Sequence, residues 1–311
     1  MTIRLAVTMG DPGGIGPEVV CKALRQWKAR RDTSFVVIGQ SAALRRYGFK
    51  ETSRICLHDP CFSGVIPPGP SKISGRASSQ CLRAAVELLR NKQVSGLVTA
   101  PVSKEALRAA DFPWPGHTEF LADSFGVPQV EMVFVSDRLK VALVTRHVSL
   151  EQAIQDVSKE RIVSCARMVM DLLRKQFLYK KPRIAVCGLN PHAGEAGLFG
   201  RQEIDEIVPA VCALNRLYPG VFSGPFAADG VFHKAGQGAY DMVLCMYHDQ
   251  GLIPFKMTEF SRGVHLTAGL PFVRTSPVHG TAFDIAGKNK ADAGSMLAAL
   301  TWARRLVSGP R

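Results

Sequence analysis

The sequence predicts an α/β protein, because short apolar runs rich in β-branched residues alternate with segments of helical periodicity along its 311 residues. This alternation is typical of strand–helix units that build a largely parallel sheet. A chain of this length in which 46% of the residues are hydrophobic can bury one large core or two of moderate size. Two domains are therefore expected.

The predicted strands are short runs of apolar and β-branched residues bounded by polar or turn-forming residues. Two of them contain cysteines, Cys187 and Cys245, and at such positions a buried thiol is expected rather than a nucleophile. The seven predicted strands are Leu5–Thr8, Phe35–Ile38, Gly96–Thr99, Met132–Val135, Val141–Val144, Ile184–Gly188 and Met242–Met246.

The predicted helices carry apolar residues at helical spacing, and the first of them has the start signals of a helix. Pro17 suits the first helical position because its missing N–H needs no partner there, and Glu18 complements the helix dipole. Val65–Gly75 and Asp111–Gly116 are predicted to be loops, and the second is a candidate domain crossing. The five predicted helices are Pro17–Ala29, Ser79–Asn91, Leu150–Gln176, Glu203–Leu217 and Ala291–Leu306.

The formal net charge of +13 favours an anionic partner, and nucleic acid is the first candidate. The basic residues, however, come in short groups such as Lys28–Arg31 and Lys180–Arg183, with no interleaved aromatic residues and no nucleic-acid module. Most of this charge is therefore assigned to solvated surface, and a few cations to an anionic small molecule.

The eight cysteines are scattered without a CxxC pair, which argues against a disulfide framework and against a thiolate zinc site. Asp11 and Pro12 interrupt the N-terminal apolar run, which therefore does not read as a signal peptide or an anchor. No stretch approaches the ~20 apolar residues that span a bilayer. A cytoplasmic protein without a membrane segment is expected.

A glycine-rich turn, MGDPGGIGPE at Met9–Glu18, connects the first predicted strand to the first predicted helix. It is not GxGxxG with dinucleotide spacing, and the chain has no GxxxxGK[ST] phosphate loop. Two interpretations stay open: a plain tight turn, or a close approach of the backbone to a ligand, for which these glycines are suited.

Three histidines follow predicted strands, at the edge where an open α/β sheet binds its ligands. His147 follows VALVTR, His192 follows IAVCGLNP, and His248 follows MVLCMY. A single histidine at a strand end is more often structural, but three at equivalent positions favour a metal site with an open fourth position. The neighbours that are candidates to orient these rings are Asn190, Glu195 and Asp249.

A phosphate site is indicated by GHTE at residues 116–119 and by two cations, Lys256 in LIPFK and Arg274 in PFVRTS. Phosphate recognition needs positive charge together with directional donors. The alternative is that Lys256 and Arg274 form ordinary surface ion pairs. Their apolar, proline-bounded surroundings favour the ligand site.

The stretch HGTAFDIAGK at His279–Lys288 places small residues on both sides of Asp284. A loop of this kind can hold an adenosine ribose through the aspartate and the backbone. Taken alone, the pattern is not specific.

Seven longer motifs follow one another along nearly the whole chain: MGDPGGIGPEV, VTAPVSK, GHTEFLA, NPHAGEAGLFG, GPFAADGVF, MYHDQGLIPFK and GLPFVRTSPVHGTAFDIAG. With these motifs the chain resembles the 4-hydroxythreonine-4-phosphate dehydrogenase family of pyridoxal phosphate biosynthesis. Its two ends are also similar to the isopropylmalate and isocitrate dehydrogenases, which share a GDGIGPE-type opening and an HGSAPDIAG-type cofactor loop.

The resemblance implies two α/β/α domains with mostly parallel sheets and an active-site cleft between them. Residues 1–115 with 275–311 would form the first domain, which carries the cofactor loop. Residues 116–274 would form the second, which carries most metal and substrate residues. The resemblance also implies a homodimer with the active site near the subunit interface.

The resemblance assigns His147, His192 and His248 as ligands of one divalent metal per subunit, with zinc favoured and cobalt, manganese or magnesium as alternatives. One position departs from the family pattern: His265 in GVHLTAGLPF stands where the family often has asparagine, although histidine can still donate a hydrogen bond. Substrate binding is implied for His117, Thr118, Lys256, His265 and Arg274, and NAD or NADP binding for Gly280, Thr281, Asp284 and Gly287.

The implied activity is NAD(P)-dependent oxidation of 4-phosphohydroxy-L-threonine, with the metal lowering the pKa of the substrate hydroxyl for hydride transfer. The product, 2-amino-3-oxo-4-(phosphonooxy)butanoate, is a β-keto acid that loses CO₂ to give 3-amino-2-oxopropyl phosphate. The general base is not identified by the sequence. Asp229, Asp249 and Lys104 are the candidates, and Asp229 is preferred.

Relatives in the same family act on phosphorylated threonate-type acids or on aromatic dihydrodiol carboxylates. The GHTE motif argues against the dihydrodiol branch, which has no phosphate to hold, but it does not exclude 4-phosphothreonate. An alternative from a different class is a non-catalytic protein that binds nucleic acid in a salt-dependent manner.

Overall fold

The computed structural model describes residues 3–28, 32–60 and 64–309. The chain forms two compact units. Unit 1 consists of Met1–Gln129 and Ser261–Arg311, and unit 2 of Val130–Phe260. Each unit is an α/β structure with its own mostly parallel set of strands, as the alternating sequence pattern predicts.

The described residues of unit 1 form six strands, and all neighbouring strands are parallel except the last pair. Their order across the sheet is β3-β2-β1-β4-β11-β10. The strands are β1 (Ile3–Thr8), β2 (Thr33–Ile38), β3 (Ile55–His58), β4 (Gly96–Thr99), β10 (Val264–Ala268) and β11 (Val273–Pro277).

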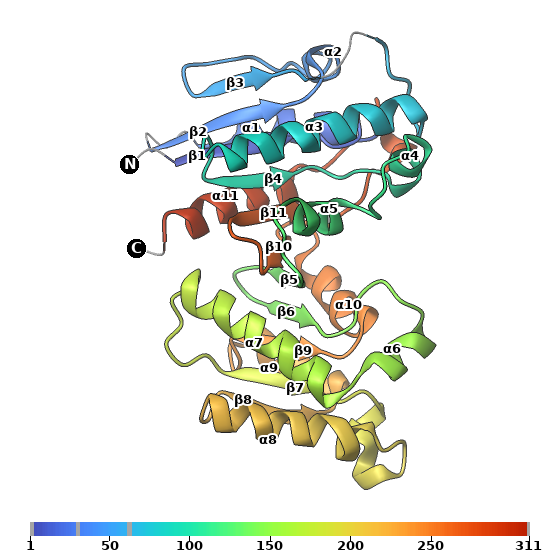
Figure 1. Ribbon diagram of the computed structural model, residues 1–311, viewed down its shortest axis with the longest axis vertical. Coiled ribbons are helices and arrows are strands. Elements are labelled where there is room, and N and C mark those ends of the chain that lie inside the picture. The colour runs from blue at the N-terminus through green and yellow to red at the C-terminus, as the bar shows by residue number, and fades with distance from the viewer. Residues whose placement is uncertain (1–2, 29–31, 61–63, 310–311) are drawn as a thin grey trace. The chain divides into compact units, whose positions relative to one another are not determined.

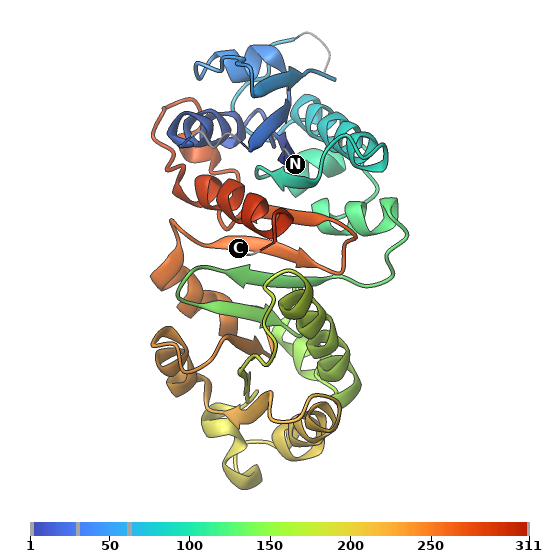
Figure 2. The same cartoon turned by 90° about the vertical axis from the view of Figure 1, so that its left-hand side faces the viewer.

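Helices cover both faces of the unit 1 strands, with α3 (Lys72–Arg90) on one face and α1 (Gly16–Gln26) and α11 (Gly294–Val307) on the other (Figures 1 and 2). The start of α3 is fixed by a capping box, in which the Ser71 hydroxyl accepts from the Ser74 N–H and the Ser74 hydroxyl accepts from the Ser71 N–H. Three shorter helices complete the unit: α2 (Ser41–Arg45), α4 (Lys104–Ala109) and α5 (His117–Ser124).

Unit 2 has five strands in the order β5-β6-β9-β7-β8. Only β5 and β6 are antiparallel; the other neighbours are parallel. The strands are β5 (Glu131–Val135), β6 (Lys140–Leu143), β7 (Ile184–Cys187), β8 (Phe222–Phe226) and β9 (Met242–Cys245).

The helices of unit 2 also lie on both faces of its strands (Figures 1 and 2). On one side are α7 (Lys159–Lys175) and α8 (Val208–Leu217), and on the other α9 (Ala228–Gly236) and α10 (His248–Glu259). The short helix α6 (Leu150–Asp156) precedes α7. Every strand of unit 2 except β8 is almost fully buried, as expected for parallel strands covered on both faces.

Three predicted helices are wrong in their extent. The helix predicted at Ser79–Asn91 begins earlier, at Lys72, inside the predicted loop Val65–Gly75. The segment Leu150–Gln176 is broken, because Val157 leaves the helical region and Ser158 caps a new helix by accepting from the Arg161 N–H. The segment Glu203–Leu217 begins as a π-helix over Glu203–Ile207, and the α-helix α8 starts only after it.

The expected domains divide the chain after residues 115 and 274, whereas the two units divide it after residues 129 and 260. Residues 116–129 and 261–274 belong to unit 1 rather than to the second unit. The reason is packing: α5 contacts α3, and β10 pairs with β11, which itself pairs with β4.

In the described part of the chain, no helix is long and apolar enough to cross a membrane. The seven cysteines in these residues are free thiols, and Cys187 and Cys245 are buried on strands as predicted. Cys61 and three of the four residues of Lys28–Arg31 lie outside the described residues.

Candidate active site

Arg274 is the centre of a polar cluster inside unit 1. Its side chain leaves β11 and is only 2% exposed. The guanidinium donates to the Thr99 hydroxyl at the end of β4 at 2.7 and 3.2 Å, and to the Thr267 hydroxyl on β10 at 3.0 Å. Three adjacent strands therefore hold this cation in a fixed orientation.

The fourth contact of Arg274 is with His265 on β10, whose Nδ1 atom lies 3.1 Å from Nη1 of the guanidinium. Because arginine only donates hydrogen bonds, Nδ1 of His265 must accept, and the ring is neutral with its proton on Nε2. The same Nδ1 lies 3.2 Å from the Ser276 hydroxyl. His265, the departure from the family pattern, thus orients Arg274.

The charge of Arg274 is not balanced by a close carboxylate. All the hydrogen-bond acceptors described above are neutral, and no acidic side chain in the described residues forms an ion pair with Arg274. Burial lowers the pKa of the guanidinium to about 10, and Glu119 opposes the shift through its charge. The group remains cationic at neutral pH, and a buried unpaired cation is costly unless a ligand supplies the anion.

The N-terminus of α5 lies in the same unit and carries the predicted residues His117 and Thr118. Gly116 precedes the helix and provides no side-chain cap, so the first N–H groups and the helix dipole remain available to an anion. Thr118 is buried. A side chain built on Gly116 would meet Oε2 of Glu119 at 3.6 Å and Cε of Lys104 at 3.8 Å, so both of these side chains belong to this neighbourhood.

His117 is neutral at physiological pH. Burial, and then the positive charge of Arg274, lower its pKa well below 6.5. Its Nε2 atom is buried and has no hydrogen-bond partner among the described residues. A buried polar atom without a partner is rare, and a bound ligand is one way to satisfy it.

The glycine-rich turn supports the expected cofactor loop. The Ile15 N–H donates to the Thr281 carbonyl at 2.9 Å. A Cβ on Gly14 would approach that same oxygen to 2.7 Å, and one on Gly13 would approach the Gly69 carbonyl to 2.3 Å. These glycines therefore allow close packing of protein backbone, which is a structural reason for their presence.

The expected cofactor residues lie on one loop of unit 1. Gly280, Asp284 and Gly287 are exposed, and Thr281 is half-buried. Beyond them, the buried Glu18 carboxylate accepts from the Ala291 N–H and the Lys22 ammonium, both at 2.7 Å. This contact pins the end of the loop to α1.

In unit 2, His147 and His248 form a pair with their ring centroids 5.3 Å apart. His147 follows β6, and His248 is the first residue of α10 after β9, the strand that pairs with β6. Both line a hollow of about 290 Å³ together with Arg146, Tyr247 and Asp249. Asp249 Oδ1 lies 2.6 Å from Nδ1 of His248. The carboxylate therefore orients the ring and leaves Nε2 as the potential metal ligand.

His192 lies on the turn Pro191–Gly197, also in unit 2. Five successive residues, His192 to Ala196, have left-handed backbone conformations, and only Gly194 among them is a glycine. Such a run costs energy in L-residues and is typical of functional segments. The His192 side chain is 66% exposed, and its Nδ1 lies 3.2 Å from the Glu195 carboxylate.

Glu203, which the sequence does not single out, holds the segment that leads to His192. Its carboxylate accepts from the Leu189 N–H at 2.6 Å, the Asn190 N–H at 2.8 Å and the Asn190 amide at 2.9 Å. Burial tends to raise the pKa of Glu203, but these hydrogen bonds outweigh it and the net shift is downward. Asn190, expected to orient His192, binds Glu203 and Gln202 instead.

The other predicted residues are dispersed. Asp229 is exposed at the start of α9, a helix that contacts the Pro191–Gly197 turn, and Lys256 is half-buried on α10. Within the described residues, no three His, Cys, Asp or Glu side chains converge as a metal site. The structure therefore brings together His147 with His248, and His117 with Arg274, but not all three histidines.

Comparisons with known proteins identify the family. A family model described as "Pyridoxal phosphate biosynthetic protein PdxA" matches residues 20–303. A 4-hydroxythreonine-4-phosphate dehydrogenase from Caulobacter vibrioides is 42% identical over 99% of both chains. A protein from Oceanobacillus iheyensis, provisionally named a D-threonate 4-phosphate dehydrogenase, is 39% identical over 97% of both chains.

Among solved structures, the 4-hydroxythreonine-4-phosphate dehydrogenase of Klebsiella pneumoniae is similar to this chain with a TM-score of 0.86 and 39% identity. The match covers 99% of this chain and 98% of that one. The similarity in sequence and in fold extends over nearly the whole of the compared chains. The chain belongs to the PdxA family of pyridoxal phosphate biosynthetic proteins.

Proposed function

We propose that the protein is a 4-hydroxythreonine-4-phosphate dehydrogenase. It would oxidise 4-phosphohydroxy-L-threonine with NAD or NADP to 2-amino-3-oxo-4-(phosphonooxy)butanoate, which loses CO₂ to give 3-amino-2-oxopropyl phosphate. The proposal rests mainly on Arg274. Its guanidinium is buried, is held by neutral groups and has no ion-pair partner in the described residues. A substrate phosphate supplies the missing anion.

The surroundings of Arg274 suit a phosphate. The guanidinium offers charge and directional donors, the α5 N-terminus offers backbone N–H groups, and neutral His117 offers a further polar atom. Lys104 adds a second positive charge nearby. In this proposal Thr118 and Lys256 are further contacts to the substrate, and His265 acts by fixing Arg274.

We propose His147, His192 and His248 as ligands of one divalent metal, with zinc favoured over cobalt, manganese or magnesium. The donor chemistry fits: the imidazoles of His147 and His248 lie with their ring centroids 5.3 Å apart, and each of His248 and His192 has a carboxylate on Nδ1. A bound divalent ion would lower the pKa of the substrate hydroxyl and would polarise the carbonyl group of the oxidised product.

The remaining residues have distinct proposed roles. Gly280, Thr281, Asp284 and Gly287 form the loop for the dinucleotide, and Asp284 is the candidate partner of a ribose hydroxyl. Asp229 is the proposed general base. Asp249 is better suited to orient His248, to which it is hydrogen-bonded, and Lys104 to the phosphate site.

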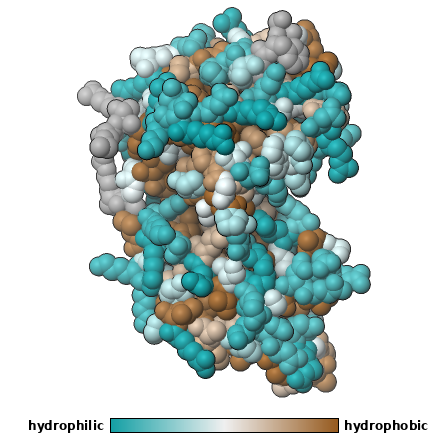
Figure 3. All heavy atoms as spheres, viewed as in Figure 1, coloured by the Kyte–Doolittle hydropathy of each residue, from teal (hydrophilic) through white to brown (hydrophobic). Residues whose placement is uncertain are grey.

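We also propose a homodimer in the cytoplasm. Ile253, Met257 and Phe260 lie at i, i+4 and i+7 along α10 and its end, and all three are more than half exposed. An exposed apolar stripe of this kind favours a protein interface. Because α10 begins at His248, a second copy on this stripe would lie near the histidine pair. In the lower half of Figure 3, over unit 2, other hydrophobic side chains lie among hydrophilic ones.

The alternative substrate is D-threonate 4-phosphate, because one relative at 39% identity carries that provisional name and the anion site fits the phosphate of either compound. The test is a side-by-side assay of both substrates with NAD⁺ and NADP⁺, before and after a strong chelator. We expect turnover of 4-phosphohydroxy-L-threonine that the chelator abolishes. Turnover of the threonate alone would contradict the proposal.

A further inference from the structure

Asp11 is a fully buried carboxylate in the glycine-rich turn, and it takes no part in the phosphate and metal sites proposed above. Its oxygens accept from the Gly13 N–H at 2.8 Å and from the Ser74 hydroxyl at 3.3 Å. The Ser103 N–H is a third donor. Burial raises the pKa of Asp11, and these hydrogen bonds oppose that shift. The carboxylate therefore joins the turn to the start of α3 and to the start of α4.

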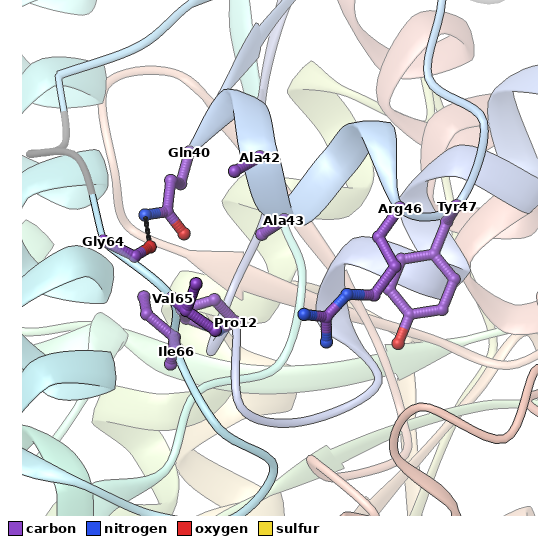
Figure 4. A pocket seen from close by; sticks show the side chains of 9 residues that line it. All are labelled: Pro12, Gln40, Ala42, Ala43, Arg46, Tyr47, Gly64, Val65 and Ile66. Atoms are coloured by element: carbon purple, nitrogen blue, oxygen red, sulfur yellow. Dashed lines mark hydrogen bonds between the residues drawn. The ribbon is translucent and has the colours of Figure 1, made fainter.

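The surroundings of the turn are packed with protein. The stretch that leads to α3 lies against the turn, because the Gly69 N–H donates to the Gly13 carbonyl at 2.9 Å. The Gln40 amide holds the same stretch by donating to the Gly64 carbonyl at 2.6 Å (Figure 4). The hollow that remains beside Pro12 has about 50 Å³, which suits water rather than a substrate. The turn is thus a junction between segments of unit 1.

One of these segments connects β4 to α4, and Asp11 holds it at its middle. The Asp11 N–H donates to the Pro101 carbonyl at 2.8 Å, and the Asp11 carboxylate accepts from the Ser103 N–H. A Cβ on Gly10 would approach the Pro101 oxygen to 2.3 Å, so the two backbones are in direct contact. The Ser103 hydroxyl is the N-cap of α4. Asp11 therefore fixes the place where α4 begins.

Both ends of the β4–α4 segment reach the proposed phosphate site. Thr99, at the end of β4, accepts from the Arg274 guanidinium at 2.7 and 3.2 Å. Lys104 is the first residue of α4, and its Cε atom would lie 3.8 Å from a Cβ on Gly116, the residue before α5. A shift of this segment would therefore move a hydroxyl that holds Arg274 and a second cation at the same site.

We propose that Asp11 is a positioning residue for the phosphate site, because it holds the β4–α4 segment so that Lys104 lies beside the substrate phosphate. The inference rests on the proposed function, which takes the bound anion to be that phosphate. Asp11 does not contact the substrate. Its effect passes through Ser103 to Lys104, the next residue in the chain, so loss of the carboxylate should matter for binding only while the lysine is present.

Calorimetric titration of the whole protein with 4-phosphohydroxy-L-threonine, D-threonate 4-phosphate and inorganic phosphate tests this role without relying on turnover. We expect Asp11→Ala and Lys104→Met each to weaken binding of the phosphorylated compounds by about tenfold. The double variant should bind no more weakly than Lys104→Met does, because both changes remove the same contact. Asp11→Asn keeps one acceptor oxygen and should regain part of the affinity that Asp11→Ala loses.

Asp32→Asn is the matched control. Asp32 is a half-buried carboxylate of unit 1 that pairs with Arg304 before β2, whereas Asp11 follows β1, the parallel neighbour of β2. The two carboxylates therefore lie at opposite ends of the strands. The control should unfold at a lower temperature and keep all three affinities.

Thermal unfolding checks that every variant is folded, and Asp11→Asn with Lys104→Met replaces the alanine pair if Asp11→Ala does not fold. Unchanged binding in a folded Asp11 variant would overturn the inference, and so would an equal loss with and without Lys104. If the predicted losses occur but the protein oxidises neither phosphorylated compound, the proposed function fails and the role of Asp11 stands. A protein that binds none of the three ligands contradicts both.

Discussion

The guanidinium of Arg274 donates to Nδ1 of His265 at 3.1 Å, inside a cluster that has no close acidic partner among the described residues. This contact fixes two properties at once: the direction of the cation and the neutral state of the histidine. The unpaired buried charge of Arg274 costs free energy of folding, but it favours binding of an anionic substrate. Substrate affinity and protein stability should therefore respond differently when Arg274 is replaced.

Replacement of Arg274 with methionine should therefore reduce kcat/KM for the phosphorylated substrate by roughly a hundredfold or more, because a buried charged contact is lost. The free energy of unfolding should change by no more than about 1–2 kcal/mol, since the desolvation cost of the cation disappears too. Steady-state kinetics and denaturant unfolding measure the two effects.

The matched variant is Arg304→Met. Arg304 is bonded to Asp32 at 2.6 Å and lies outside the Arg274 cluster. It should lose stability and keep kcat/KM. A strongly unfolded Arg274→Met protein would argue that Arg274 is a structural residue.

His265→Asn should keep kcat/KM within a few-fold, because an amide oxygen can accept from the guanidinium as Nδ1 does. His265→Leu leaves a buried N–H of Arg274 without its acceptor, which costs about 1–3 kcal/mol of stability. The leucine variant should also raise KM for the substrate more than the asparagine variant does. Equal KM values in the two variants would refute the orienting role.

The pH dependence of stability should report the neutral state of His117, whose Nε2 atom is buried. Its pKa is depressed in the folded protein relative to 6.5, so the unfolded chain binds more protons below that pH. Stability from this group is therefore complete above roughly pH 6.5 and declines as pH falls, by at most about 1.4 kcal/mol per pH unit. Denaturant unfolding between roughly pH 5 and pH 8 should show a shallower acid slope in His117→Gln. Parallel curves would contradict this role.

Glu203→Gln tests whether zinc binding requires the hydrogen bonds by which Glu203 holds the backbone before His192. The amide replaces a carboxylate oxygen that accepts two N–H groups, and a loss of about 1–3 kcal/mol is expected. Because the pKa of Glu203 is lowered in the folded state, this contribution exists above the ordinary value of 4.5 and is lost as pH falls below it. Zinc affinity should fall with stability in the variant. Glu206→Gln is the control, because Glu206 is a nearby half-buried carboxylate that accepts from the Lys159 N–H, and this variant should keep the zinc affinity.

Much of the fold was predictable because most strands are apolar and continuous. All seven predicted strands are present, each with bounds within two residues of the prediction. The strands β10 and β11 escaped prediction because the buried His265, Thr267, Arg274 and Ser276 interrupt the apolar pattern. Those same residues form the Arg274 cluster, so local rules failed where the polar site is built.

The sequence proposed candidate site residues but predicted few of their contacts. His147 and His248 were proposed because each follows a predicted strand, and Asp249 was proposed because it is next to His248 in the sequence. Glu203 was not found, because it acts on residues 13 and 14 positions earlier in the chain through a turn with left-handed backbone. Helix α10 was missed because Gly251 and Pro254 lie within it.

His147 and His248 are paired, whereas His192, the third proposed metal ligand, has an exposed side chain on a turn. In a homodimer whose interface includes the α10 stripe, we expect His192 of one copy to complete the pair of the other. His192→Ala and His248→Ala proteins should each lose zinc and activity. When they are co-refolded, half of the dimers are mixed, and one of the two sites in each mixed dimer is intact. Activity and zinc content should then return to roughly a quarter of the unchanged protein. Absence of recovery in a mixture that forms dimers would mean that all three ligands belong to one chain.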